Sequence, residues 1–130
     1  MPDPIIDRLD HIKGRADMAT DGPWVAEYSG EQGNCVLPHD ARSTREAVAV
    51  TRLFHQQADA EFIAAARTDA PQMEAALRAV LNLHRRATDF YEPVDFCAEC
   101  SSLYRAVEWP CSTRRVVASE LGVEIEGGEK

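Results

Sequence analysis

The stretch FCAECSSLYRAVEWPCSTRR, residues 96–115, holds three of the four cysteines of the chain and governs how its C-terminal part is built. Cys97 and Cys100 form a C-x-x-C pair, and ten residues separate Cys100 from Cys111. Cysteines in such a pattern can form a disulfide framework, a redox pair or a metal site, or can serve as small core residues. The surrounding residues distinguish these alternatives.

A disulfide framework, a thioredoxin-like redox pair and a deaminase zinc site each lack the sequence context that they need. The N-terminal MPDPIIDRLD is acidic and has no basic-then-apolar signal pattern, so we expect a cytoplasmic protein, in which disulfides are rare. A thioredoxin-like C-x-x-C opens a helix after a βαβ strand, and no such pattern precedes Cys97. A deaminase zinc site needs Pro directly before the C-x-x-C and an H-x-E upstream, but Phe96 stands there and no histidine is followed by x-Glu.

A structural zinc site accounts best for the pattern. Zinc takes four tetrahedral N or S ligands, often as a C-x-x-C pair plus a second pair supplied by the fold. Cys97, Cys100 and Cys111 supply three thiolates, and His84 supplies the fourth ligand in the spacing H-x12-C-x2-C-x10-C. The weaker candidates for the fourth position are His55, His39, Cys35 and His11. The alternative is that His84 is a satisfied core histidine and the cysteines are small hydrophobic residues.

The segment TDAPQMEAALRAVLNLHRR, residues 68–86, predicts the helix that carries His84. Asp69 and Gln72 have capping-box spacing, and Pro71 stands in the first turn. One face of this helix collects the residues that we expect to point inward: Met73, Leu77, Val80, Leu81 and His84. A metal bound there would fill all four positions with protein ligands, so it would stabilise the fold and would not activate water.

The N-terminal half predicts a helix, a sheet and a second helix. Asp3 and Pro4 start an amphipathic helix, which the Gly22-Pro23 pair ends. Three strand-like runs then indicate a small antiparallel meander, at residues 23–28, 34–38 and 46–54. A helix from Ser43 onward competes with the third strand, so residues 43–56 stay open. Asp59 is positioned to cap a helix over residues 60–67.

The predicted fold class is therefore α+β, with an N-terminal helix, a three-stranded antiparallel sheet, two helices and a zinc-tied C-terminal element. Ser112 or Thr113 caps a last short helix, and Gly122 ends it. We expect a single compact domain over 1–130, in which 1–83 is the α+β part, 84–122 the zinc-bound part and 123–130 a flexible acidic tail.

Several motifs resemble phage and prophage proteins. ATDGPW (19–24) and DAEFIAAARTDAPQMEAALRAVL (59–81) are similar to a pattern of Ead-type phage early-region proteins. LH, CAEC and WPCST resemble the LH…CxxC…WPCxT zinc-binding tail of small actinobacteriophage and actinobacterial proteins, and the two matches cover about two thirds of the chain. Asp21 and Ala70 depart from the first pattern, outside the ligands. The resemblance implies a small accessory protein in the cytoplasm of an infected or lysogenic bacterium.

Charge and composition narrow the function. The net charge is −8, which opposes nucleic-acid binding. No phosphate loop, catalytic constellation or membrane span is recognisable, so we expect no enzyme and no membrane partner. The main hypothesis is a binding module, an adaptor or inhibitor of a host or phage protein. Its expected contact residues are Trp109, Tyr104, Arg105, Arg114 and Arg115. The alternative is a nucleic-acid-binding zinc protein that uses Arg85, Arg86, Arg105, Arg114 and Arg115.

Overall fold

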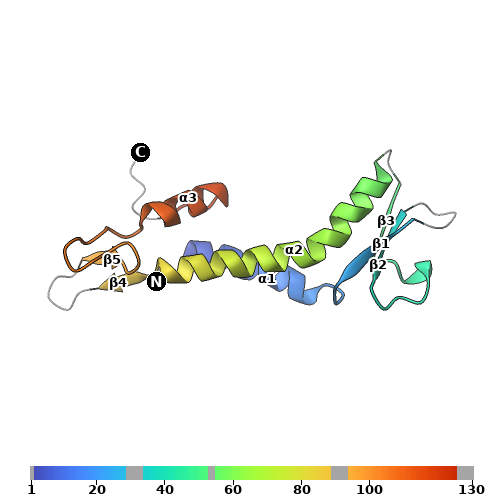
Figure 1. The fold of residues 1–130 in the computed structure, drawn as a ribbon, viewed down its shortest axis with the longest axis horizontal. Coiled ribbons are helices and arrows are strands. Elements are labelled where there is room, and N and C mark those ends of the chain that lie inside the picture. Colours follow the sequence, from blue (N-terminus) through green and yellow to red (C-terminus); the bar gives the residue numbers. More distant parts are fainter. Residues whose placement is uncertain (1, 29–33, 53–54, 89–93, 126–130) are drawn as a thin grey trace. The chain divides into compact units, whose positions relative to one another are not determined.

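The computed structural model describes residues 2–28, 34–52, 55–88 and 94–125 (Figure 1). Over these residues the chain forms three α-helices, a three-stranded antiparallel sheet and a two-stranded antiparallel sheet, which confirms the α+β class. The chain divides into two compact units, one of residues 13–73 and one of residues 1–12 and 74–130. The helices α1 (Pro4–Met18) and α2 (Gln56–Leu83) each contribute residues to both units.

The unit of residues 13–73 holds the predicted meander. The strands β1 (Trp24–Glu27), β2 (Asn34–Pro38) and β3 (Ala49–Thr51) pair in chain order, and Cys35 of β2 faces Glu27 on one side and Val50 on the other. One face of the sheet packs on the first turns of α2, where Val36, Ala60 and Ala64 form a buried cluster. Trp24 is partly buried and packs against this cluster.

Residues 43–56 contain both a short helical turn and a strand. A 3-10 turn, η1 (Thr44–Glu46), follows Ser43, whose side chain forms a complete capping box with Glu46. The capping box stabilises a single turn, and the chain returns to extended backbone at Ala47. The helix that competed with β3 is therefore limited to η1. The end of the third predicted strand, at residues 53 and 54, lies outside the described residues.

The two helices expected over residues 60–67 and 68–86 are one helix, and the prediction of a break between them is wrong. Helix α2 runs from Gln56 to Leu83 with Pro71 inside it, and Asp59 lies in its first turn instead of capping it. An internal proline removes one backbone hydrogen bond and costs about 3 kcal/mol. Apolar burial on both sides of Pro71, at Ala64 and at Leu81, favours continuing the helix through it.

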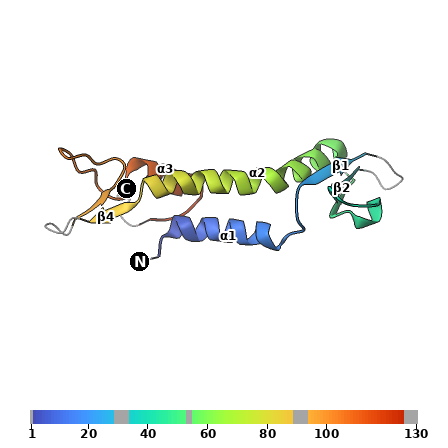
Figure 2. The ribbon, with the colours of Figure 1, turned by 60° about the horizontal axis from the view of Figure 1, so that its bottom comes forward.

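The other unit is built around the start of α1 and the last turns of α2, which lie alongside each other (Figures 1 and 2). Its buried cluster consists of Ile5, Leu9, Leu81 and Ala118, and Leu77 packs against it. Asp3 caps α1 as expected, because its Oδ1 accepts hydrogen bonds from the backbone N–H groups of Ile5 (3.1 Å) and Ile6 (3.4 Å).

The inward face predicted for the end of α2 is correct only in part. Leu77 and Leu81 pack into the core, whereas Met73 and Val80 are exposed. Glu74 is buried in their stead, and its carboxylate accepts a hydrogen bond of 2.7 Å from the Arg78 side chain. The apolar face that α2 packs against the core is therefore narrower than the sequence pattern predicts.

Helix α3 (Ser112–Glu120) completes this unit and ends as predicted at Gly122. Gly122 has a φ of 65°, and the N–H groups of Gly122 and Val123 bond the carbonyls of Ser119 and Ala118, which is a Schellman motif. Of the expected tail, Val123 and Ile125 pack against the buried cluster, and residues 126–130 lie outside the described residues. Among the described residues, no helix combines the length and apolarity needed to cross a bilayer.

Candidate metal centre

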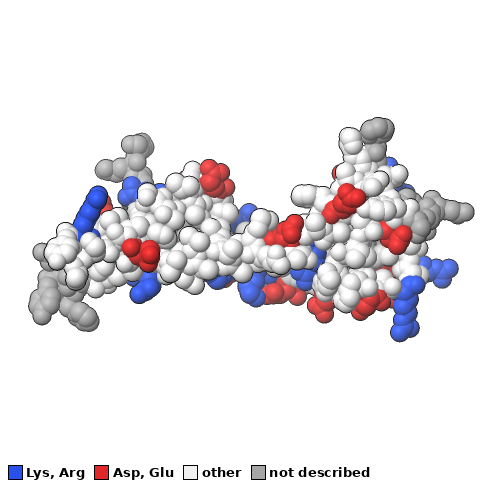
Figure 3. Space-filling view, viewed as in Figure 1, with Lys and Arg blue, Asp and Glu red and all other residues white. Residues whose placement is uncertain are grey.

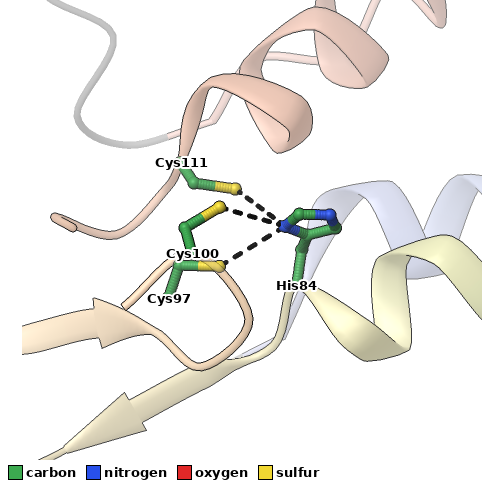
Figure 4. A group of neighbouring side chains, drawn as sticks. All are labelled: His84, Cys97, Cys100 and Cys111. Atoms are coloured by element: carbon green, nitrogen blue, oxygen red, sulfur yellow. Dashed lines mark hydrogen bonds between the residues drawn. The ribbon is translucent and has the colours of Figure 1, made fainter. Parts of the chain in front are cut away.

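His84 stands directly after the last residue of α2, where its backbone still belongs to the helical turn. Its N–H donates to the carbonyl of Val80 at 3.2 Å, which is the i to i−4 bond of an α-helix. The ring is partly buried, and its Nδ1 atom points toward three cysteine sulfurs (Figure 4). The end of the long helix thus fixes both the position and the direction of this side chain.

A short hairpin presents Cys97 and Cys100. Strand β4 (Arg86–Thr88) pairs with β5 (Asp95–Cys97), and Cys97 lies opposite Arg86. After β5 the chain turns sharply, with the N–H of Ser101 bonded to the carbonyl of Cys97 at 3.1 Å. The turn brings the side chain of Cys100 back toward that of Cys97. An ion pair between Arg86 and Asp95 joins the two strands beside the turn, and this hydrogen bond lowers the pKa of Asp95.

Cys111 occupies the N-cap position of α3, which corrects the expectation that Ser112 or Thr113 caps this helix. Burial raises the pKa of the Cys111 thiol, but the nearby backbone N–H groups of Arg114 and Thr113 and the other two thiols outweigh this effect and lower it. Neither N–H makes a hydrogen bond of capping geometry to the sulfur. A helix N-terminus stabilises a thiolate through its aligned N–H groups.

The four side chains converge as a tetrahedral metal site requires. The Nδ1 atom of His84 lies 3.5 Å from the sulfur of Cys97, 3.4 Å from that of Cys100 and 3.6 Å from that of Cys111. Zinc bonds of about 2.3 Å to sulfur and about 2.0–2.1 Å to nitrogen at tetrahedral angles give nitrogen–sulfur separations of about 3.6 Å. All four ligand atoms lie within 4.8 Å of one another. The cluster is therefore able to hold a metal ion through three sulfurs and one nitrogen.

The pKa of the Cys100 thiol is raised by its position among the other ligands. The residue as a whole is exposed, but its sulfur faces the other ligands. Partial desolvation, together with hydrogen bonds to the sulfurs of Cys97 and Cys111, raises its pKa to about 11. Three thiolates at this spacing repel one another, and a divalent cation removes the repulsion by binding all three.

Arg114 holds the backbone of the ligand His84, a role that is not predicted from the sequence. Its Nε donates to the carbonyl of His84 (2.8 Å) and its Nη2 to that of Leu81 (3.1 Å), so it caps the C-terminal end of α2. It also pairs with Asp3 and stacks on Trp109, with 4.5 Å between the guanidinium carbon and the ring centroid. The residue is 4% exposed and is used inside the protein, so it offers no surface to a partner.

The other residues expected to contact a partner lie at or near the surface around the metal-ligand loop, residues 101–110. Tyr104 is 96% exposed at the tip of a turn that Ser102 and Arg105 close with two mutual backbone hydrogen bonds. Leu103 shares the tip and is 97% exposed. It is not among the contact residues predicted from the sequence, although a Leu-Tyr pair between Ser and Arg is the signal that points to it. Arg105 and Arg115 are also exposed.

Trp109 is partly buried and is not a protruding anchor. Arg114 covers one face of its ring, and Trp109 forms part of the wall of a groove of about 760 Å³. Both chain segments of this unit line the groove, which includes Ile5, Arg85, Arg86, Pro110 and Ile125. Tyr91, which flanks the same loop in sequence, lies outside the described residues.

The competing ligands named from the sequence do not join the cluster. Among the described residues, the group able to hold a metal ion contains His84 and the three cysteines of residues 97–111. Cys35 is buried in β2 of the other unit, as expected for a small hydrophobic residue. His11, His39 and His55 are exposed.

Comparison with known protein families, curated proteins and solved structures finds no match to the chain.

Proposed function

We propose that the protein is a small zinc-stabilised binding module that attaches to another protein through the metal-ligand loop. The tip of that loop carries the proposal: Leu103 and Tyr104 are 97% and 96% exposed. A leucine and a tyrosine at full exposure bury almost no apolar surface within the protein, whereas in a partner's pocket both side chains would bury it. Tyrosine is also among the residues that most often dominate the energy of protein interfaces.

Zinc has a structural role in this proposal. The nitrogen–sulfur distances and the donor set of one imidazole and three thiols suit zinc, and four protein ligands leave no position for a reacting water. The loop of residues 101–110 joins two of the ligands, Cys100 and Cys111, so the metal would hold its ends together. Binding energy of this kind is folding energy, and no catalytic role is assigned to the metal.

The biological setting follows only from the resemblance stated above. We place the module among phage and prophage accessory proteins acting as an adaptor or inhibitor inside a bacterial cell. The partner would be a host or phage protein.

The charged residues favour a protein partner over nucleic acid. Of the arginines considered for nucleic-acid binding, Arg114 is buried and Arg86 is paired with Asp95. On the face shown in Figure 3, basic and acidic side chains are interspersed across the described surface and form no continuous basic area. A net charge of −8 adds long-range repulsion from phosphates.

The test compares captured proteins quantitatively. Zinc-loaded wild type, a Leu103→Ser/Tyr104→Ser double variant and a Val116→Ser control are used to capture proteins from a bacterial lysate, followed by mass spectrometry. Val116 is exposed on α3 of the same unit, so its replacement removes apolar surface away from the tip. We expect the double variant to keep its zinc. The amount of partner that it captures should be at least tenfold lower than the amount captured by wild type and by the control.

Two outcomes would contradict the proposal. Equal recovery of partners by all three proteins would remove the tip from the interface. Tight, salt-sensitive shifts of DNA or RNA that disappear in an Arg105→Ala/Arg115→Ala variant would favour nucleic acid as the partner.

A further inference from the structure

The three cysteines of the metal cluster differ in their access to solvent. Cys97 is 0% and Cys111 2% exposed, whereas Cys100 is exposed. The difference follows from the fold, because Cys97 ends a paired strand and Cys111 is the N-cap of α3, while Cys100 lies in the turn after β5, where its contact with His84 is exposed. A reagent from solvent therefore meets the cluster first at the Cys100 side.

Accessible thiolates react with peroxides, and buried ones are protected. A thiolate sulfur attacks one peroxide oxygen, so that a sulfur–oxygen bond forms, the oxygen–oxygen bond breaks and the leaving hydroxide is protonated to water. A second thiolate then attacks the resulting sulfenic acid, a disulfide forms and the sulfenic oxygen leaves as water. Two thiolates lose two electrons in total, and the peroxide with two protons becomes two waters.

Cys97 is the partner that the local structure favours for this second step. It lies three residues before Cys100 on the same turn, and both sulfurs point toward the Nδ1 atom of His84 (Figure 4). Cys111 is also within the 4.8 Å cluster, but it belongs to a separate element, α3. A bond between Cys97 and Cys100 would take two of the four ligands from the metal at once.

We propose that Cys100 is an oxidant-accessible modification site, through which a hydroperoxide converts Cys97 and Cys100 to a disulfide and releases the metal. The inference rests on the proposed zinc site and adds regulation to it. Release of the metal frees Cys111 from the other end of the metal-ligand loop, so the Leu103–Tyr104 tip loses its fixed ends. Oxidation would thus switch off the proposed partner binding, and reduction with zinc would restore it.

The experiment uses the full zinc-loaded chain and hydrogen peroxide. Zinc release is followed with a chromophoric chelator, and peptide mass mapping after alkylation identifies the oxidised cysteines. We expect one equivalent of zinc to be released with a Cys97–Cys100 disulfide, while Cys35, buried in β2, stays reduced. Cys35→Ala serves as the matched control and should release zinc at the wild-type rate.

The decisive variant is Cys100→His, which keeps four zinc-competent ligands but removes the sulfur of the exposed residue Cys100. We expect its zinc release by peroxide to be at least tenfold slower than in wild type. A second measurement on the wild type does not depend on how this variant folds: a sulfenic-acid trap added early should label Cys100 before the other cysteines.

An unchanged release rate in Cys100→His would overturn the inference, as would first labelling of Cys97 or Cys111. Purified protein without zinc would instead contradict the proposed structural zinc. Zinc that stays bound under peroxide would leave that proposal intact and refute only the oxidation step.

Discussion

Replacing Arg114 with Met tests how the metal centre is supported. Methionine retains much of the apolar stem of arginine but removes the guanidinium that bonds the carbonyls of His84 and Leu81 and pairs with Asp3. The change therefore separates the polar contacts of Arg114 from its packing. It also leaves the four candidate ligands in place.

The expected loss of stability can be built from these contacts. A hydrogen bond that involves a charged group contributes about 1.5–3 kcal/mol, and loss of one partner of a buried ion pair costs about 3–5 kcal/mol. The carboxylate of Asp3 is 31% exposed, so water solvates it after the change and the ion-pair cost is reduced. Because the contacts share one side chain, their costs do not add, and we expect about 3–4 kcal/mol in total. This is a large fraction of the roughly 5–15 kcal/mol that stabilises a typical domain.

The metal should respond as well, because Arg114 holds the backbone of His84. Loss of a group that orients a metal ligand lowers affinity by about 10–100-fold. The free energy of unfolding is measured by urea denaturation at saturating zinc, and zinc affinity by competition with a chelator. Arg114→Lys keeps the charge without the planar fork and should fall between wild type and Arg114→Met.

The neighbouring Arg115 provides the matched control. It is exposed, and its Nε donates a hydrogen bond of 2.9 Å to the carbonyl of Pro110. Arg115→Met should therefore cost no more than about 1 kcal/mol and keep wild-type zinc affinity. If Arg114→Met unfolds within 1 kcal/mol of wild type and binds zinc equally well, the reasoning about Arg114 is wrong.

Three further outcomes are expected. Cys111→Ser and His84→Ala should lose zinc and unfold at least the unit that holds the cluster, as measured by metal analysis and circular dichroism. Cys35→Ala should retain one equivalent of zinc, because Cys35 is buried outside the cluster. Zinc loss in Cys35→Ala would exclude the proposed ligand set. Gly122→Ala should cost about 1 kcal/mol in thermal unfolding, since Gly122 has a positive φ although a Cβ there would meet no neighbour; an unchanged melting temperature would contradict this. In the metal-free protein the pKa of Cys100 is about 11, so zinc must displace a proton from this thiol at neutral pH. Apparent zinc affinity should then rise at least about tenfold per pH unit between about pH 6 and pH 8, and a flat profile would mean that Cys100 does not bind the metal.

The cluster could be predicted from the sequence because its signals are local. The C-x-x-C pair fits a single turn, and His84 stands where the predicted helix brings an inward-facing residue to its end. The strands were predicted for the same reason, since alternating apolar residues and Gly-containing loops define a meander within a few residues.

Features that depend on distant residues could not be predicted. Asp3 and Arg114 are 111 positions apart, and no local pattern pairs them. Pro71 predicts a helix start, which is its usual local meaning, but packing on both sides of it keeps one helix intact. Propensity predicts Ser112 or Thr113 as the cap of α3, but Cys111 occupies that position and its side chain belongs to the metal cluster.

The position of Arg114 within α3 has a consequence for other chains that build this site. Cys111 is the N-cap of the helix and Arg114 its third residue, so the first turn directs one side chain to the cluster and another to the end of α2. A distant homologue could replace most of the surrounding surface and still keep this geometry. Its sequence should then show an extended signature, H-x12-C-x2-C-x10-C-x2-R, together with an acidic residue at the cap of its first helix.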